Sequence, residues 1–160
     1  MKNILIVIYI LINVHICNGQ TILIGEKSYP STNSFSYAET LYGMPMMGVS
    51  VGKDGSDGIL YISLGILYSD CSISGGIKLF LKDQSILALN TVVAKDKVNE
   101  RIIIIYKISA DQISDLLNNE ISSIRISLRW PSDPEIKKYE VVCSQSAEFK
   151  KEVQDLFLTN

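Results

Sequence analysis

Histidine is nearly absent from this chain, since His15 is the only one among 160 residues. A Ser-His-Asp or Cys-His nucleophile needs an imidazole as its base, and histidine-ligated zinc or iron sites need imidazole nitrogens. The sequence also contains no P-loop, no GxGxxG and no HExxH motif. His15 lies in the N-terminal segment that we predict below to be removed, so the mature chain has no histidine. We therefore predict no catalytic residue of these classes, no cofactor-binding residue and no metal site.

The chain also lacks an excess of basic side chains. It has 15 Lys and Arg against 17 Asp and Glu, a formal net charge of -2, whereas nucleic-acid-binding domains usually carry a clear basic surface. The sequence thus predicts no nucleic-acid partner. With 47% hydrophobic and 20% charged residues, the composition is typical of a folded globular chain. The length suits a single domain, which we place at residues 20–160.

The N-terminal apolar run, Ile4–Val14, is shorter than the roughly 20 residues that a membrane-spanning helix requires. It follows Lys2, and the small residues Cys17 and Gly19 stand at positions -3 and -1 of a cut before Gln20. This arrangement is typical of a secretory signal. We predict a signal peptide at residues 1–19 and an exported protein, either periplasmic or extracellular.

Two alternatives stay open for this segment. It would serve as a membrane anchor if it is not cleaved, and Cys17 would carry a lipid if the signal is of the lipoprotein type. Ile16 stands directly before Cys17, where lipoprotein signals place a small residue. We expect membrane association only through one of these two routes.

The sequence has few cysteines, and no two of them form a Cys-x-x-Cys redox motif. Removal of the signal leaves Cys71 and Cys143, an even number in a compartment that favours oxidation. We expect these two residues to form a disulfide bond. The alternative is that both are buried free thiols, which behave as small hydrophobic side chains.

Several segments have the alternating or continuous apolar pattern of β-strands. The strongest are Gly58–Tyr68 and Arg101–Ile108, and Ile124–Leu128 alternates with polar residues. Gly58–Tyr68 is apolar on both faces, so we expect it to lie centrally between two layers. Ile77–Asn90 indicates a hairpin. Ser28–Ser36, rich in Ser, Pro and Asn, is expected to be a loop.

Two helices are expected in the second half of the chain. Ser109 and Gln112 form a capping-box pattern before a short helix at about 110–119. A C-terminal helix at about 146–158 has apolar residues on one face, namely Phe149, Val153, Leu156 and Phe157. Alternating βαβ units are absent. The sequence therefore predicts a β-rich α+β fold, a mostly antiparallel sheet or a β-sandwich with two helices.

The region of about 77–129 contains a characteristic series of segments. A Lys/Leu/Phe-rich hairpin and an Ile-rich strand ending in Tyr-Lys-Ile-Ser precede the Asp-Gln-Ile-Ser-Asp-Leu-Leu helix and an Ile-Ser-Ser-Ile-Arg-Ile strand. This order resembles a pattern in small exported proteins of Bacteroidetes. The resemblance implies an exported scaffold of this kind and brings no functional residues.

Carboxylate chemistry does not need histidine, because glycoside hydrolysis uses two Asp or Glu residues alone. The candidates by residue type are Asp54, Asp57, Asp70, Asp133, Glu135 and Glu140. No spacing in the sequence brings two of them together. Met44, Met46 and Met47 could ligate Cu(I) through sulfur, but methionine is also a common core residue. We predict neither a catalytic nor a metal-binding role for these residues.

A partner-binding surface is the remaining functional hypothesis. Arg125 and Arg129 lie on one face of a strand, and Trp130 follows where that strand meets a loop. Trp and Arg are enriched at binding hot spots, although a loop Trp also covers the end of a core. We predict a non-catalytic exported domain that binds a protein or an envelope component. The alternatives are an inhibitor or immunity protein against a secreted enzyme, and a carboxylate-dependent hydrolase.

Overall fold

The computed structural model of the chain describes residues 20–37, 47–65, 71–98 and 101–159, and all elements below lie within these ranges. The first six strands are β1 (Gln20–Ile24), β2 (Lys27–Ser31), β3 (Phe35–Tyr37), β4 (Met47–Asp54), β5 (Asp57–Gly65) and β6 (Ser72–Ile73). They are followed by β7 (Ile77–Leu81), β8 (Ile86–Leu89), β9 (Val92–Val98), β10 (Arg101–Ile108), α2 (Ala110–Asn118), β11 (Ile121–Trp130), β12 (Asp133–Val142) and α3 (Ser146–Leu158).

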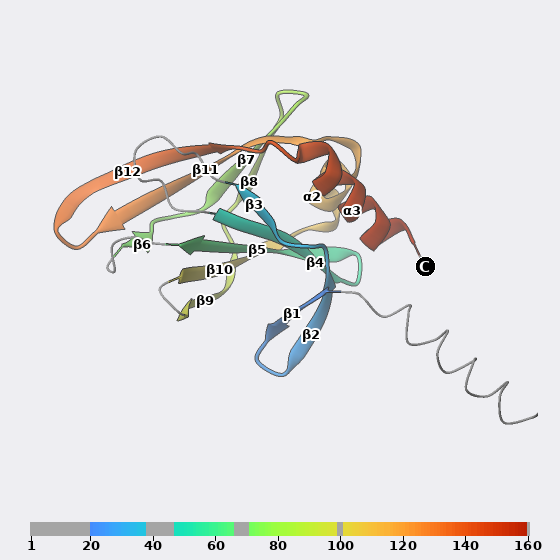
Figure 1. The fold of residues 1–160 in the computed structure, drawn as a ribbon, viewed down its shortest axis with the longest axis horizontal. Coiled ribbons are helices and arrows are strands. Elements are labelled where there is room, and N and C mark those ends of the chain that lie inside the picture. The colour runs from blue at the N-terminus through green and yellow to red at the C-terminus, as the bar shows by residue number, and fades with distance from the viewer. Residues whose placement is uncertain (1–19, 38–46, 66–70, 99–100, 160) are drawn as a thin grey trace, which may run out of the picture.

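The strands form two antiparallel sheets. A seven-stranded sheet has the order β1-β2-β4-β5-β10-β9, with β3 also paired to β4. A five-stranded sheet has the order β12-β11-β7-β8, with β6 also paired to β11. Figure 1 shows the sheets stacked as two layers, with α2 and α3 at one end and the β1–β2 hairpin outside the stack. The prediction of a β-rich α+β fold with a mostly antiparallel sheet is confirmed.

The main core lies between the two sheets and beneath the two helices. It draws buried side chains from nearly every element, among them Met47, Leu60, Ile62, Leu79, Tyr106, Ile124, Ile126 and Phe149. The central strand β5 has buried residues on both faces, as its sequence predicted, because the main core covers one face and a second apolar cluster covers the other. That second cluster lies outside the sandwich and defines the candidate site below.

Both predicted helices are confirmed within one residue at each end. The Ser109 side chain accepts a hydrogen bond from the backbone N–H of Gln112, whose side chain in turn accepts from the N–H of Ser109. This capping box satisfies two backbone donors that would otherwise lack partners. In α3, Phe149 meets Phe35 edge-on, with ring centroids 5.3 Å apart. The C-terminal helix is therefore anchored in the core by an aromatic contact to β3.

The expected loop at Ser28–Ser36 is wrong, because this segment contributes to both β2 and β3. Its strands are short and contain polar residues, so their composition resembles that of a loop. Pro30 is tolerated because it lies on a strand opposite Thr21, in a hairpin where not every residue needs a backbone donor.

Strand β9 was not predicted from the sequence either, because Lys95, Asp96 and Lys97 interrupt its apolar residues.

The predicted signal peptide lies outside the described residues. Within the residues that the structure does describe, no helix is both long enough and apolar enough to cross a membrane.

Candidate binding groove

The outer face of the seven-stranded sheet carries an apolar cluster that does not belong to the main core. Ile22, Ile59 and Ile105 are buried there, and Ile24, Tyr29, Tyr61, Ala94 and Ile103 pack against them. The outer face of an antiparallel sandwich is ordinarily wet and polar. The Ile-rich strand β10 instead alternates between the two clusters, with Ile104 facing the main core and Ile105 facing outward.

Strand register explains how the floor of this outer site is built. Directly opposed residues of an antiparallel pair lie on the same face. One row across the sheet is Ser50, Tyr61, Ile105 and Ala94, and the next row is Gly48, Ser63, Ile103 and Asp96. The floor therefore has small residues over β4, an aromatic ring at its centre and branched aliphatic side chains over β10.

The β1–β2 hairpin forms one wall by crossing the outer face of the sheet. Its pairing to the sheet is limited to Ser31 opposite Gly52. A Cβ atom placed on Gly52 would lie 3.3 Å from Cδ1 of Ile22 and 2.8 Å from Cγ1 of Ile59. The glycine thus gives Ile22 room to reach the floor. An isolated two-stranded hairpin is marginally stable in water. Burial of Ile22, worth about 1.5–3 kcal/mol, therefore helps to hold the hairpin on the sheet, together with the packing of Ile24 and Tyr29.

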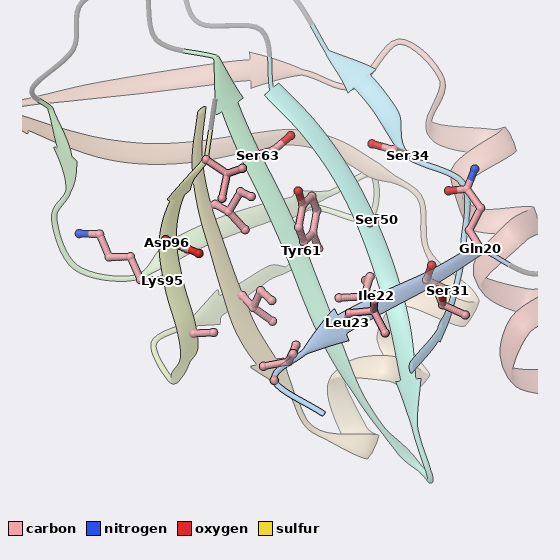
Figure 2. Close-up of a pocket in the computed structure, with 17 residues that line it drawn as sticks. Gln20, Ile22, Leu23, Ser31, Ser34, Ser50, Tyr61, Ser63, Lys95 and Asp96 are labelled. Atoms are coloured by element: carbon pink, nitrogen blue, oxygen red, sulfur yellow. The ribbon is translucent and has the colours of Figure 1, made fainter. Parts of the chain in front are cut away.

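Between this wall and β9 lies a groove of about 670 Å³, which we call the outer groove. Its apolar lining is Ile22, Leu23, Ile24, Ala94, Val98, Ile103 and Ile105, and its hydroxyl groups belong to Thr21, Ser31, Ser34, Ser50, Tyr61 and Ser63. Figure 2 shows β1, with Ile22 and Leu23, in front of the strands that carry Ser50 and Tyr61. Concave sites of this size, mostly apolar with a few polar groups, are typical of ligand sites.

The floor of the outer groove over β4, β5 and β10 is built from uncharged side chains. Among the described lining residues two are charged, and both are on β9: Asp96 lies in the floor row of Ile103, whereas Lys95, opposite Ile104, belongs to the other face of the sheet. A further cation, Arg101, lies near one end, where its Nη2 donates a hydrogen bond to Oγ of Ser63 at 3.0 Å. The groove therefore favours ligands whose contacting part carries no net charge.

Of the three residues predicted to bind a partner, Arg125 and Arg129 lie on the same, less buried face of β11, whereas Trp130 packs against the main core. The Arg125 guanidinium donates from Nε and Nη2 to Oε2 of Glu140, at 3.1 and 2.7 Å, and lies 4.6 Å from the centre of the Phe80 ring. Trp130 packs against the main core and meets Tyr139 at 6.1 Å. Arg129 is exposed on β11. Arg125 is thus engaged within the outer face of the five-stranded sheet, whereas Trp130 serves the core.

The expected disulfide between Cys71 and Cys143 is wrong, since the structure has both as buried free thiols. Strand β11 separates them: Ser72, next to Cys71, pairs with Arg129, whereas the Cys143 N–H donates to Ser122. Seven residues of strand span about 23 Å, far beyond the roughly 7 Å limit between bridged Cα atoms. Burial raises the pKa of the Cys143 thiol to about 12, so neither redox nor nucleophilic chemistry is favoured there.

The candidate carboxylates are held mostly in ion pairs at separate places. Asp57 contacts Lys107 at the start of α2, Asp133 contacts Lys137 at the β11–β12 turn, and Glu140 contacts Arg125. The pKa of each is held below its usual value by hydrogen bonds, from Lys107, Lys137 and Ser123 respectively, as the largest cause. These pKa shifts favour the ionised form, whereas a general acid needs a raised pKa.

The remaining carboxylate and methionine candidates add no site. Asp54 is exposed and faces Asp57 across the β4–β5 turn, and Glu135 is exposed on β12. Met47 is fully buried in the main core, while Asp70, Met44 and Met46 lie outside the described residues. Among the residues that the structure describes, no cluster of three or more His, Cys, Asp or Glu could hold a metal ion.

Sequence reasoning missed the outer groove, although one signal was present. The apolar residues on both faces of Gly58–Tyr68, which contains most of β5, predict burial between two layers. The covering on the outer side is the β1–β2 hairpin, which contacts the sheet through residues distant in sequence.

Comparisons of the chain with protein-family models, with curated proteins and with solved structures found no match. The functional argument therefore rests on the geometry of the outer groove.

Proposed function

We propose that this chain is a non-catalytic exported domain that binds an uncharged, partly apolar portion of a protein or envelope component in the outer groove. The observation that carries the proposal is the apolar floor on the outside of the sandwich, formed by Tyr61, Ile103 and Ile105. Apolar surface removed from water by a ligand contributes roughly 25 cal/mol per Å². The uncharged floor adds selectivity, because a charged group placed over Tyr61 and Ile105 would lose its hydration without gaining a partner there.

The polar groups of the groove suit a binding role better than a hydrolytic one. Among the lining residues that the structure describes, Asp96 is the only carboxylate, and none is histidine or cysteine. Carboxylate-pair hydrolysis needs two such groups about 5–10 Å apart. The hydroxyl groups of Ser50, Ser63 and Tyr61 can orient a ligand through hydrogen bonds, as the few polar groups of binding sites commonly do.

The test uses the neutral apolar dye Nile red as a probe of the groove. The purified chain should increase the fluorescence of the dye, and Ile103→Lys should weaken binding by about tenfold or more, since it places a charge on the floor. Val142→Lys is the matched control, because Val142 is 61% exposed on the five-stranded sheet. Thermal unfolding of both variants verifies that they fold. Equal affinity of the two folded variants for the dye would contradict the proposal.

A further inference from the structure

Strand β1 turns its backbone edge, rather than one of its faces, toward the outer groove. Six consecutive residues, from Gln20 to Gly25, line it, whereas β5 and β10 contribute alternate residues, such as Tyr61 with Ser63 and Ile103 with Ile105. Successive side chains of a strand point to opposite faces. A strand that lines the groove with every second residue therefore turns one of its faces to the groove and forms the floor. A strand that lines it with consecutive residues, as β1 does, turns its edge to the groove.

The hairpin turn determines which backbone groups of β1 point into the groove. Ile24 pairs with Lys27 across a two-residue turn in which Gly25 has a φ of +59°, as in type II′ turns. In such a hairpin the two residues that flank the turn exchange backbone hydrogen bonds, and hydrogen-bonded and non-bonded pairs then alternate along the strands. Ile22 and Ile24 therefore bond to β2, while the backbone groups of Thr21 and Leu23 point away from it.

Two further observations agree with this assignment. Pro30, which has no N–H, lies opposite Thr21 in a pair that needs no donor. Among the described strands, β1 pairs with β2 alone. The edge at Thr21 and Leu23 thus offers donors and acceptors beside an apolar floor, and the Leu23 side chain is 71% exposed above it.

We propose that an extended segment of a partner protein adds to β1 as a further strand and lies along the outer groove. This inference rests on the proposed function and names the occupant of the same site. The free backbone edge selects an extended peptide, since an acyl chain or another purely apolar ligand could not use it. The uncharged floor selects uncharged side chains at the alternate positions that face Tyr61, Ile103 and Ile105. A segment of about five residues, roughly 17 Å long, matches the length of β1.

The probe is a peptide selected from a phage-displayed library of random decapeptides on the purified chain and then synthesised. We expect it to be uncharged at alternate positions over about five residues. On its addition, the amides of Thr21 and Leu23 should exchange with solvent more slowly, whereas those of Ile22 and Ile24, already bonded to β2, should change little. The absence of selected binders, or slower exchange confined to other strands, would overturn the proposal.

Two proline variants test whether peptide binding depends on the backbone N–H groups of the β1 edge. Leu23→Pro removes the N–H that faces the groove, and Ser28→Pro removes the opposing N–H, which faces away from it, in the same non-bonded pair. We expect Leu23→Pro to weaken peptide binding by about tenfold, and Ser28→Pro and Leu23→Ala to change it less than threefold. Equal losses in the two proline variants would overturn strand addition.

Nile red separates this inference from the proposed function. Both proline variants should still bind the dye, because neither alters the floor, and this also verifies that the hairpin stays in place. If the unaltered chain binds Nile red but its peptide affinity does not distinguish Leu23→Pro from Ser28→Pro, strand addition is wrong and the groove is still a binding site. If the unaltered chain does not bind the dye, the proposed function fails first.

Discussion

Ile22 lies over Gly52 where the β1–β2 hairpin crosses the seven-stranded sheet. The side chain of Ile22 is 7% exposed, and a Cβ on Gly52 would lie 3.3 Å from its Cδ1. Any residue other than glycine would compete with Ile22 and Ile59 for this space. The position of the hairpin, and hence one wall of the outer groove, depends on the absence of a side chain at position 52.

Replacement of Gly52 by valine should displace the hairpin while the sandwich stays folded. The new side chain would meet Ile59 and Ile22. The hairpin is joined to β4 only at its end, by the pairing of Ser31 with Gly52 and the hydrogen bonds between Thr32 and Val51. We expect faster amide exchange at Ile22 and Ile24 and weaker Nile red binding. Ser28→Val, at an exposed position of the same hairpin, is the control. Unchanged exchange in Gly52→Val would show that the hairpin is fixed by other contacts.

Cys71 and Cys143 should both react as free thiols. When the protein is denatured without reductant and treated with iodoacetamide, mass spectrometry should find each cysteine in its own alkylated peptide. In the folded protein, Cys143 should react far more slowly than a free thiol at pH 8, because its pKa is raised to about 12 and the thiolate is the reactive form. A single linked peptide containing both residues would contradict the separation along β11.

Export is tested at the N-terminus of the protein isolated from its native host. If Lys2 and the run Ile4–Val14 form a cleaved signal, the first peptide found by mass spectrometry should begin at or near Gln20. Gln20 is also the first residue of β1, so cleavage there would leave the hairpin intact. Recovery of the chain with Met1 from the cytosol would refute export.

The sequence alone predicted the helices and strands whose signals lie within a few neighbouring residues. The capping box joins Ser109 and Gln112, three residues apart, and the apolar face of α3 recurs at helical spacing, so both helices were predicted correctly. The apolar strands β5 and β10 were visible for the same reason. The antiparallel fold class followed from the order of these elements.

The outer groove and the distance between Cys71 and Cys143 depend on contacts between residues far apart in the chain, so they could not be predicted from the sequence. The groove exists because the hairpin around Gly25 meets Gly52 and Ile105, and no periodic pattern marks that contact. The disulfide was expected from compartment and cysteine number alone, whereas the pairing of β6 and β12 along β11 decides the distance. Likewise, the sequence predicts only that Arg125 shares a strand face with Arg129, and the register of β11 and β12 is needed to show that Glu140 lies opposite Arg125.

The Asp57 carboxylate should stabilise the protein at neutral pH but not in acid. It contacts Nζ of Lys107 at 2.9 Å and accepts a hydrogen bond from the N–H of Ala110 at the start of α2. Because its folded pKa lies below the usual 3.8, this stability is present above that pH and is lost as the pH falls through the folded pKa. Asp57→Asn should thus lower the midpoint of thermal unfolding at pH 7 and have a progressively smaller effect as the pH falls below 3.8. The exposed Glu26, replaced by Gln, is the control, and an equal loss at pH 7 and in acid would exclude the ion pair as the cause.

Phe149 should be the residue of α3 on which stability depends most. It is 2% exposed and meets Phe35 edge-on, and a free helix of about 13 residues is marginal in water. Truncation of a buried Phe to Ala costs about 3–5 kcal/mol, a large share of the roughly 5–15 kcal/mol that stabilises a domain. Phe149→Ala should therefore lower the midpoint of urea unfolding sharply, whereas Lys151→Ala, at an exposed position of the same helix, should leave it nearly unchanged. Lys150 is unsuitable as this control, because its Nζ donates to the carbonyl of Asn118 at 2.7 Å. Small and equal effects of the two variants would mean that α3 is not anchored through this side chain.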